Sequence, residues 1–332
     1  MKIRTVVQFV TRHPPDAAVR SRLECRQAGG VLSTLAQRAL FVSVFCWIGL
    51  ATTAGAKIRV VASITDLGSI ASAVGGDQVE VQAIARPTAD VHHVEVLPSY
   101  MVRVSRAQLY IKVGLGLDQW ADQIIDGSRN DKLTVLDAGE RIDALEKPTG
   151  KVEASMGDVH PNGNPHYWLD PHNGTVVARE IAEVLGRLDP AHAADFTARA
   201  EAFAREADAL SGAATQALAS LPVHAIVTYH ASWVYLGHAF GFEIPATVEP
   251  VPGIPPTGKH LEDLVGLIKG KQISILLQEP YFSDEAAEFL KRQTGLRVIK
   301  MSPSCDTVDA GSYLGHIQQI VDAIKGSPAT GN

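Results

Sequence analysis

The sequence predicts an α/β protein of two lobes, each with a four-stranded parallel sheet flanked by helices, joined by one long rigid helix. Short apolar runs rich in Val and Ile recur along the chain with helix-length segments between them. Such runs are typical of buried parallel strands in βα units. A single continuous helical pattern, residues 189–222, separates two groups of these runs. With 332 residues, 46% hydrophobic and 20% charged, the chain is long enough for two ordinary domains and unlike a disordered chain.

Residues 1–56 are predicted to be a secretory signal peptide that is removed. They hold seven basic and two acidic residues, a net charge of +5, which leaves −11 for residues 57–332 out of the whole-chain −6. The basic part leads into an apolar run at residues 39–51 and then into small residues that end in Ala-x-Ala. This run is shorter than the ~20 residues of a membrane span. We therefore expect a periplasmic protein, with a buried helix or a membrane anchor as the alternative for this run. Because the basic leader is unusually long, we expect the true start nearer Val31.

Cysteine content and charge exclude further classes. Cys25 and Cys46 lie in the leader, so Cys305 alone remains in the processed chain and no intramolecular disulfide can form. The acidic balance argues against nucleic-acid binding, because phosphates require a basic face.

Eight apolar runs are the predicted strands. In the first lobe, residues 57–188, they span residues 58–64, 79–85, 109–114 and 133–138. In the second lobe, residues 223–326, they span residues 225–230, 242–250, 273–280 and 296–302.

The predicted connecting helix covers residues 189–222. Asp189 is a favourable N-cap, Pro190 a favourable first residue, and Pro222 ends the helix. Because the segment is not the Gly/Ser-rich kind that makes a flexible linker, we expect the lobes to be rigidly related. Its apolar positions alternate in spacings of four and three, which forms one stripe: Phe196, Ala200, Phe203, Ala207, Leu210, Ala214 and Leu218.

Four segments near the ends of predicted strands carry side chains that bind metals. In open α/β sheets, ligands bind beyond the carboxyl ends of the strands. The segments read ARPTADVHHVEVLPS, GNPHYWLDPHN, IVTYHASW and MSPSCDTVDAGSY. The candidate ligands in them are His92, His93, His166, His172, His230, Cys305, Asp306 and Asp309.

These segments resemble the motifs of the periplasmic zinc and manganese solute-binding proteins of ABC transporters, and the resemblance covers essentially all of residues 57–325. ADVHHVEVLPS aligns without a gap to a motif of the type ADPHSYEPTPS, which places His92 on the first ligand. NPHYWLDP matches the DPHxWLDP motif and makes His166 the second. His230 matches a strand-end His or Glu that precedes a helix. Asp306 matches an acidic residue that precedes a Ser/Thr-Tyr pair, here residues 312–313.

Several alternatives stay open at this predicted site. His93 can exchange with His92, and Asp309 or Cys305 can replace Asp306. His172 is expected to cap or position the next helix.

Many zinc-specific relatives carry a long His/Asp-rich loop before the second ligand, and here only SMGDVHPNGN occupies that place. Whether His160 in this remnant assists metal capture stays open, as it does for His93.

The resemblance implies a set of three imidazoles and one carboxylate, two ligands from each lobe. This nitrogen-rich shell suits tetrahedral Zn²⁺, whereas manganese prefers more oxygen. Because the protein fills all four positions, we expect capture of zinc rather than catalysis. The alternatives are manganese or iron binding in the same fold, or a periplasmic zinc hydrolase. The resemblance also implies delivery of zinc to the permease and ATPase subunits of an ABC importer. We expect a monomer, and whether a metallochaperone loads it stays open.

Other side chains have predicted supporting roles. Glu279, at the end of a strand, is expected to accept a hydrogen bond from a metal-bound imidazole. Tyr167 and Trp168 are expected to pack beneath the site. Residues 253–260, GIPPTGKH, resemble a phosphate-binding loop but have His260 in place of the Ser/Thr that holds Mg²⁺, so we expect them to cover the cleft. Metal affinity is expected to fall below about pH 6–6.5, because imidazoles bind metal only when neutral.

Overall fold

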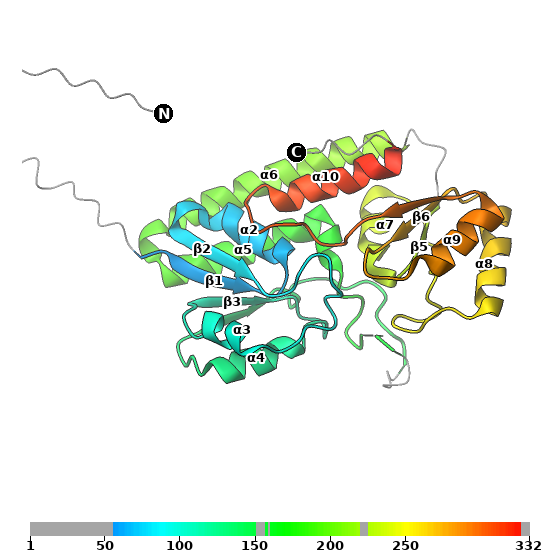
Figure 1. Cartoon of the computed structure of the whole chain (residues 1–332). Coiled ribbons are helices and arrows are strands. Elements are labelled where there is room, and N and C mark those ends of the chain that lie inside the picture. The colour runs from blue at the N-terminus through cyan, green and yellow to red at the C-terminus, as the bar shows by residue number, and fades with distance from the viewer. Residues whose placement is uncertain (1–55, 151–156, 159, 220–224, 327–332) are drawn as a thin grey trace, which may run out of the picture. The chain divides into compact units, whose positions relative to one another are not determined.

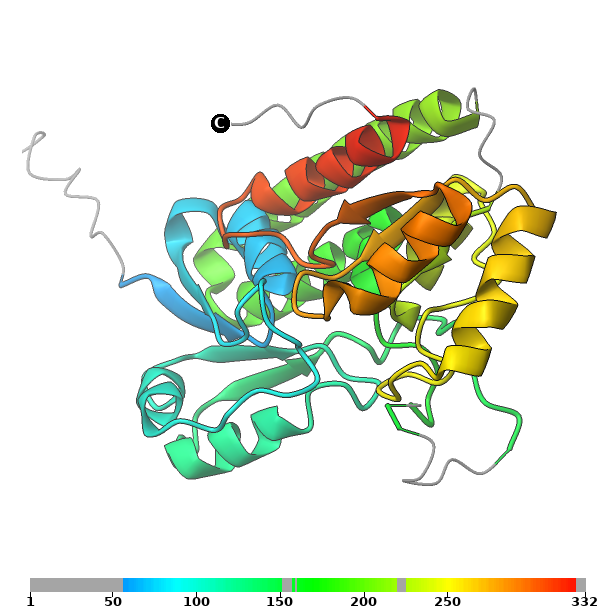
Figure 2. The ribbon, with the colours of Figure 1, turned by 45° about the vertical axis from the view of Figure 1, so that its right-hand side comes forward.

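Two parallel sheets, one from each half of the chain, form the framework of the protein in a computed structural model (Figures 1 and 2). It describes residues 56–150, 157–158, 160–219 and 225–326, all of which belong to one unit, Gly55–Asn332. The predicted signal peptide therefore lies, except for its last residue, outside the described residues and stays a prediction. No helix in the described ranges has both the length and the apolar character that crossing a membrane requires.

The first sheet has the predicted four parallel strands in the order β2-β1-β3-β4. Helices α2 and α5 cover one face of this sheet, and α3 and α4 cover the other (Figures 1 and 2). The strands are β1 (Ile58–Ala62), β2 (Val79–Ala83), β3 (Leu109–Lys112) and β4 (Thr134–Asp137). The helices are α2 (Thr65–Gly75), the 3₁₀ turn η2 (Gly76–Gln78), α3 (Pro98–Val104), α4 (Trp120–Ser128) and α5 (Pro171–Leu188).

The second sheet has three parallel strands in the order β5-β6-β7. Successive residues of β6 face opposite sides: Leu276 packs in a small core with α8 and α9, whereas Ile275 and Leu277 pack in the main core. The strands are β5 (Val227–Thr228), β6 (Ile275–Gln278) and β7 (Arg297–Lys300). The helices of this half are α7 (Val234–Phe240), α8 (Gly258–Gly270), α9 (Asp284–Thr294) and α10 (Ser312–Lys325).

The predicted fourth strand of the second sheet, residues 242–250, does not form. This segment runs beside β5 but pairs with it only through two isolated parallel bridges, Ala225 with Glu243 and Thr228 with Thr247. Pro245 lies between the two bridges, and proline has no backbone N–H to donate to a ladder. The α/β class is as predicted, and the prediction of four strands in the second sheet was wrong by this one strand.

The predicted connecting helix is present as the 3₁₀ turn η5 (Pro190–His192) followed by α6 (Ala193–Ala219), while residues 220–224 lie outside the described residues. Its predicted apolar stripe is buried, except that Leu210 is partly exposed. Helix α6 packs against α2 and α5 of the first half and against α7 and α10 of the second (Figure 1). Asp189 does not cap a backbone N–H, because its Oδ2 accepts from His192 Nδ1 at 2.6 Å.

One hydrophobic core contains residues from both sheets. Val60 and Ile111 of the first sheet belong to the same buried cluster as Ile275 and Leu277 of the second, together with Phe203 of α6. Densely packed apolar side chains resist displacement, because a movement of one side chain strains its neighbours. This continuity is a physical reason to expect small local changes at the junction of the sheets when a ligand binds.

Candidate metal centre

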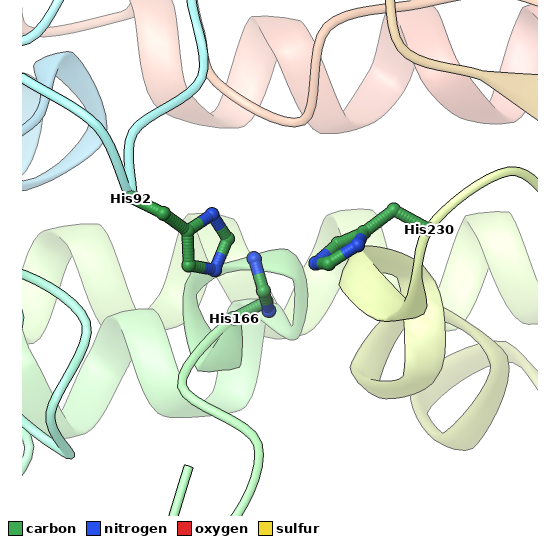
Figure 3. A group of neighbouring side chains, drawn as sticks. All are labelled: His92, His166 and His230. Atoms are coloured by element: carbon green, nitrogen blue, oxygen red, sulfur yellow. The ribbon is translucent and has the colours of Figure 1, made fainter. Parts of the chain in front are cut away.

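Three imidazole rings from distant segments meet where the two halves of the chain adjoin (Figure 3). His92 follows β2, His166 precedes the 3₁₀ turn η4 (Tyr167–Leu169), and His230 lies between β5 and the 3₁₀ turn η6 (Ala231–Trp233). One ring nitrogen of each lies within 4.8 Å of those of the other two. A zinc–nitrogen distance of ~2.0–2.1 Å places tetrahedral ligand atoms about 3.4 Å apart. A small inward movement of the rings therefore suffices to enclose one ion.

All three rings are withdrawn from solvent. His166 and His230 are 2% and 4% exposed, and the side chain of His92 is 5% exposed. The ring centroids are 5.1 Å apart for His92 and His166, 5.2 Å for His92 and His230, and 5.4 Å for His166 and His230. For His166, burial favours the neutral ring, which is the state that coordinates a metal.

Two of the histidines are oriented by the same local turn. His92 donates from both its backbone N and its ring Nδ1 to Asp90 Oδ1, at 2.9 and 2.8 Å. His166 donates in the same way to Asn164 Oδ1, at 3.0 Å from each nitrogen. An Asx side chain that bonds two residues ahead is a common turn device. With Nδ1 engaged, Nε2 of each ring carries the free lone pair for the metal.

The third histidine receives its partner from another segment. His230 Nδ1 donates to Glu249 Oε2 at 2.6 Å, and both side chains are buried. Gly253 N also donates to Glu249 Oε2 at 3.1 Å, which holds the carboxylate in place. Glu249 was not predicted from the sequence, although it lies near the end of an apolar run in the same way that Glu279 does.

Glu279 does not accept from an imidazole. Its Oε1 accepts from Ser232 Oγ at 2.8 Å and from Trp233 Nε1 at 2.9 Å. Its charge nevertheless acts on His230 and favours the protonated ring. The predicted role of Glu279 is therefore filled by Glu249.

The pKa values of the rings differ because their surroundings differ. Burial lowers the pKa of His166 well below 6.5, and the charges of His92 and His230 act in the same direction. Burial also acts to lower the pKa of His230, but the hydrogen bond to Glu249 and the nearby carboxylates outweigh it, so this pKa is raised. Burial lowers the pKa of His160 to about 4. Of these three rings, His230 is the one that holds a proton most strongly.

Tyr167 and Trp168 form the predicted apolar floor. Both are fully buried, and the Trp168 ring lies 5.2 Å from that of His166. Tyr167 OH donates to Val113 O at 2.9 Å, and Trp168 Nε1 donates to Pro303 O at 2.8 Å. The polar atoms of both side chains thus have hydrogen-bond partners. These bonds hold η4 in place, and with it His166, which directly precedes η4.

Asp306 does not join the three histidines. Its side chain is exposed, and it lies near His316 of α10, on whose pKa its charge acts. The chain before it is bound to the start of α2: Thr65 Oγ1 donates to Cys305 O at 2.5 Å, and Cys305 N donates to Asp66 Oδ1 at 3.1 Å. This path buries residue 305 and leaves residue 306 at the surface. The expectation that Asp306 meets the imidazoles is corrected accordingly.

The alternative ligands also lie outside the three-histidine group. Cys305 is buried, its thiol contacts Thr307 O at 3.3 Å, and burial raises its pKa. Asp309 is exposed and accepts from Thr307 Oγ1 at 2.8 Å. The His93 side chain is 71% exposed. His172 lies in the first turn of α5, where its backbone N donates to the N-cap Asp170 at 2.8 Å.

The loop that resembles a phosphate-binding loop lies beside the site. A cavity of about 290 Å³ is lined by Gly253 and Pro255 as well as by His92, His230 and Glu249. Thr257 caps α8 by accepting from His260 N at 3.2 Å, and His260 Nε2 contacts Thr247 O at 3.0 Å. His260 is therefore engaged in capping and packing, as expected for a covering loop.

Replacing Glu249 with glutamine is expected to weaken metal binding by roughly 10–100-fold, because outer-shell partners of metal-bound histidines contribute about that much. The amide keeps an acceptor for His230 but loses the charge. Competition with a coloured chelator measures the change. Glu243→Gln is the matched control, since Glu243 lies earlier in the same segment, is 70% exposed and pairs with Lys271. Equal affinity in both variants would contradict the role of Glu249.

Metal affinity is expected to begin falling above pH 6.5 on acidification, earlier than the sequence alone suggests. Metal binds only neutral imidazole, and the raised pKa of His230 brings proton competition to a higher pH. The slope is about tenfold per pH unit for one proton displaced. Titrations from pH 8 to pH 5.5 measure it. In Glu249→Gln the fall should start at lower pH, and a flat profile down to pH 6 in the unaltered protein would contradict the assignment.

The fold and the three-histidine group define a class: a two-lobed α/β solute-binding protein for a metal ion. The family model described as "Zinc-uptake complex component A periplasmic" matches residues 60–327, and the chain belongs to this family. The family resemblance inferred from the four motifs is thereby confirmed. Members of this family are metal-binding periplasmic components of uptake systems.

Similar proteins carry names with different metals. The chain is 26% identical over 279 residues to "Iron-binding protein YfeA" of Yersinia pestis, covering 81% of this chain and 85% of that protein. It is 24% identical over 313 residues to "High-affinity zinc uptake system protein ZnuA" of Brucella abortus (strain 2308), covering 82% and 90%. The solved structure of the solute-binding protein FpvC of Pseudomonas aeruginosa in complex with Mn²⁺ is 25% identical with a TM-score of 0.67, covering 81% and 97%.

Proposed function

We propose that the protein captures Zn²⁺ in the periplasm and hands it to a membrane ABC importer. The observation that carries this proposal is the convergence of His92, His166 and His230, each with Nδ1 bonded to a side-chain oxygen. Three pre-oriented imidazole Nε2 atoms form a nitrogen-rich site, which suits zinc better than manganese. The name of the Brucella relative supports the same metal.

The partners follow from the family. The substrate-binding component of an ABC uptake system requires permease and ATPase subunits, so we propose those as partners. We also propose that the protein acts as a monomer and receives its metal from a metallochaperone. We propose export by the leader in residues 1–56. Membership of a transport family supports capture over hydrolysis.

Iron or manganese binding in the same fold is the second candidate. It is favoured by the name of the Yersinia relative and by the Mn²⁺ complex of FpvC. Iron also accepts imidazole ligands, so the three histidines alone discriminate less well against iron than against manganese.

Elemental analysis of the processed protein, purified from periplasm without added metal, tests the proposal. We expect about one zinc per chain and little iron or manganese. Subsequent dialysis against equimolar zinc, iron(II) and manganese(II) should leave zinc bound. Stoichiometric iron or manganese in place of zinc, or no metal in either experiment, would overturn the proposal. His92→Ala/His166→Ala serves as the metal-free reference.

A further inference from the structure

We propose that His160 is the fourth protein ligand of the metal, so that four imidazoles enclose the ion. This inference rests on the proposed function, in which His92, His166 and His230 bind the metal. It assigns the fourth coordination position to the segment before His166. The exposed Asp306 leaves that position without a ligand from the last loop of the chain.

His160 lies directly beside the three-histidine group. Its ring stacks on that of His92, with centroids 5.4 Å apart and planes inclined by 26°. His160, His166 and His230 line one cavity of about 350 Å³. The ring thus contacts that of His92 and shares a cavity with the other two proposed ligands.

The ring nitrogen that would bind the metal is buried without a partner. Within the described part of the chain, Nε2 of His160 and Nε2 of His92 are both inaccessible to solvent and accept or donate no hydrogen bond. Leaving such a group unsatisfied is unfavourable, so each one calls for an explanation. Two unsatisfied imidazole nitrogens on stacked rings have a common explanation if one ion binds both.

The backbone holds His160 in this position. Asp158 N donates to Pro252 O at 2.9 Å, and Gly163 N donates to His160 O at 3.2 Å, so bonds fix the chain on both sides. Gly157 has φ +67°, and a Cβ there would clash with Pro252 O. The close approach of these two loops therefore requires glycine, and it places His160 against the site.

A small rearrangement completes the shell. His160 is not among the residues whose ligand atoms all lie within 4.8 Å of one another, so its ring must turn or shift toward the other three. Asp158, two residues before His160, bonds Pro252 in the loop that contains Gly253, and Gly253 lines the neighbouring cavity with His230 and Glu249. Closing on the metal would draw this loop pair inward. Four imidazoles without a carboxylate would favour zinc over manganese more strongly than three would.

X-ray absorption spectroscopy of the zinc-loaded processed protein tests the inference, because outer-shell scattering counts imidazole ligands. We expect four imidazoles in the unaltered protein and three with one oxygen ligand in His160→Ala. When loaded with Co²⁺, the unaltered protein and His160→Ala should also differ in their visible absorption bands, because one nitrogen ligand is replaced by oxygen. Zinc affinity, measured by chelator competition, should fall on the order of 100-fold in His160→Ala. His93→Ala, which alters an exposed neighbouring histidine, should match the unaltered protein in all three measurements.

The outcomes separate this inference from the proposed function. Stoichiometric zinc with three imidazoles in both the unaltered protein and His160→Ala, at equal affinity, would overturn the assignment of His160 and leave zinc capture intact. A protein that binds no zinc would overturn both. A carboxylate or water in the fourth position of the unaltered protein would likewise exclude His160 as the ligand.

Discussion

His230→Ala is expected to weaken zinc binding by about two orders of magnitude or more while the protein remains folded. Structural zinc sites release roughly 10–16 kcal/mol on binding, so one of four ligands contributes about 3 kcal/mol, or on the order of 100-fold in affinity. The substitution removes the ligand and also leaves the Glu249 carboxylate buried without its imidazole partner. The loss should therefore be larger than for Glu249→Gln.

Chelator competition at pH 7.5 measures the zinc affinity of His230→Ala, and circular dichroism with thermal unfolding checks the fold. His93→Ala and His238→Ala are suitable controls, since these side chains are 71% and 65% exposed. Zinc affinity in His230→Ala equal to that of the controls would remove His230 from the site. A parallel loss in His166→Ala is expected, because the two rings face the same point (Figure 3).

Trp168→Ala is expected to lower the free energy of unfolding of the metal-free protein by about 3–5 kcal/mol, the usual effect of removing a large buried aromatic side chain. Trp168 is fully buried, packs on His166 and donates to Pro303 O at 2.8 Å. The substitution removes contacts in the first half of the chain together with one hydrogen bond to the segment after β7. Zinc affinity should fall as well, because His166 loses the surface that supports it.

Urea denaturation of apo protein measures this effect without any contribution from bound metal. Trp168→Phe is the matched variant: it keeps an aromatic ring but loses the N–H and leaves Pro303 O unpaired, for a smaller cost of roughly 1–3 kcal/mol. If Trp168→Ala unfolded at the same urea concentration as the unaltered protein, the floor of the site would not depend on this residue.

Much of the fold could be predicted because the relevant interactions are local. Strands of a parallel sheet are rich in apolar, β-branched residues, so β1 to β4 and β5 to β7 could be recognised in the sequence as short apolar runs. The stripe from Phe196 to Leu218 likewise follows directly from helical periodicity. Residues 242–250 have the same apolar character, and the effect of Pro245 on the ladder depends on whether a neighbouring strand needs its N–H.

In the candidate site, too, one part could be predicted from the sequence and another could not. His92, His166 and His230 were predicted from their places near strand ends and from the resemblance of short motifs to those of a metal-binding family, and the structure brings them together. Asp306 was also predicted from its place in a motif. Its position depends on contacts of Cys305 with Thr65 and Asp66, more than 230 residues away, and those contacts leave Asp306 exposed.

The α/β class could be predicted from the sequence because the apolar pattern of strands and helices repeats over a few residues. The family and the three histidines could be predicted because short motifs resemble those of known proteins. The groups that surround those histidines became known only from the folded arrangement. Glu249 bonds His230 and His160 stacks on His92 because separate segments of the chain pack against one another. Trp168, which packs on His166, is itself held by a hydrogen bond to the distant Pro303. The choice of a buried polar partner follows from desolvation, since an imidazole removed from water needs the nearest available acceptor or a metal ion.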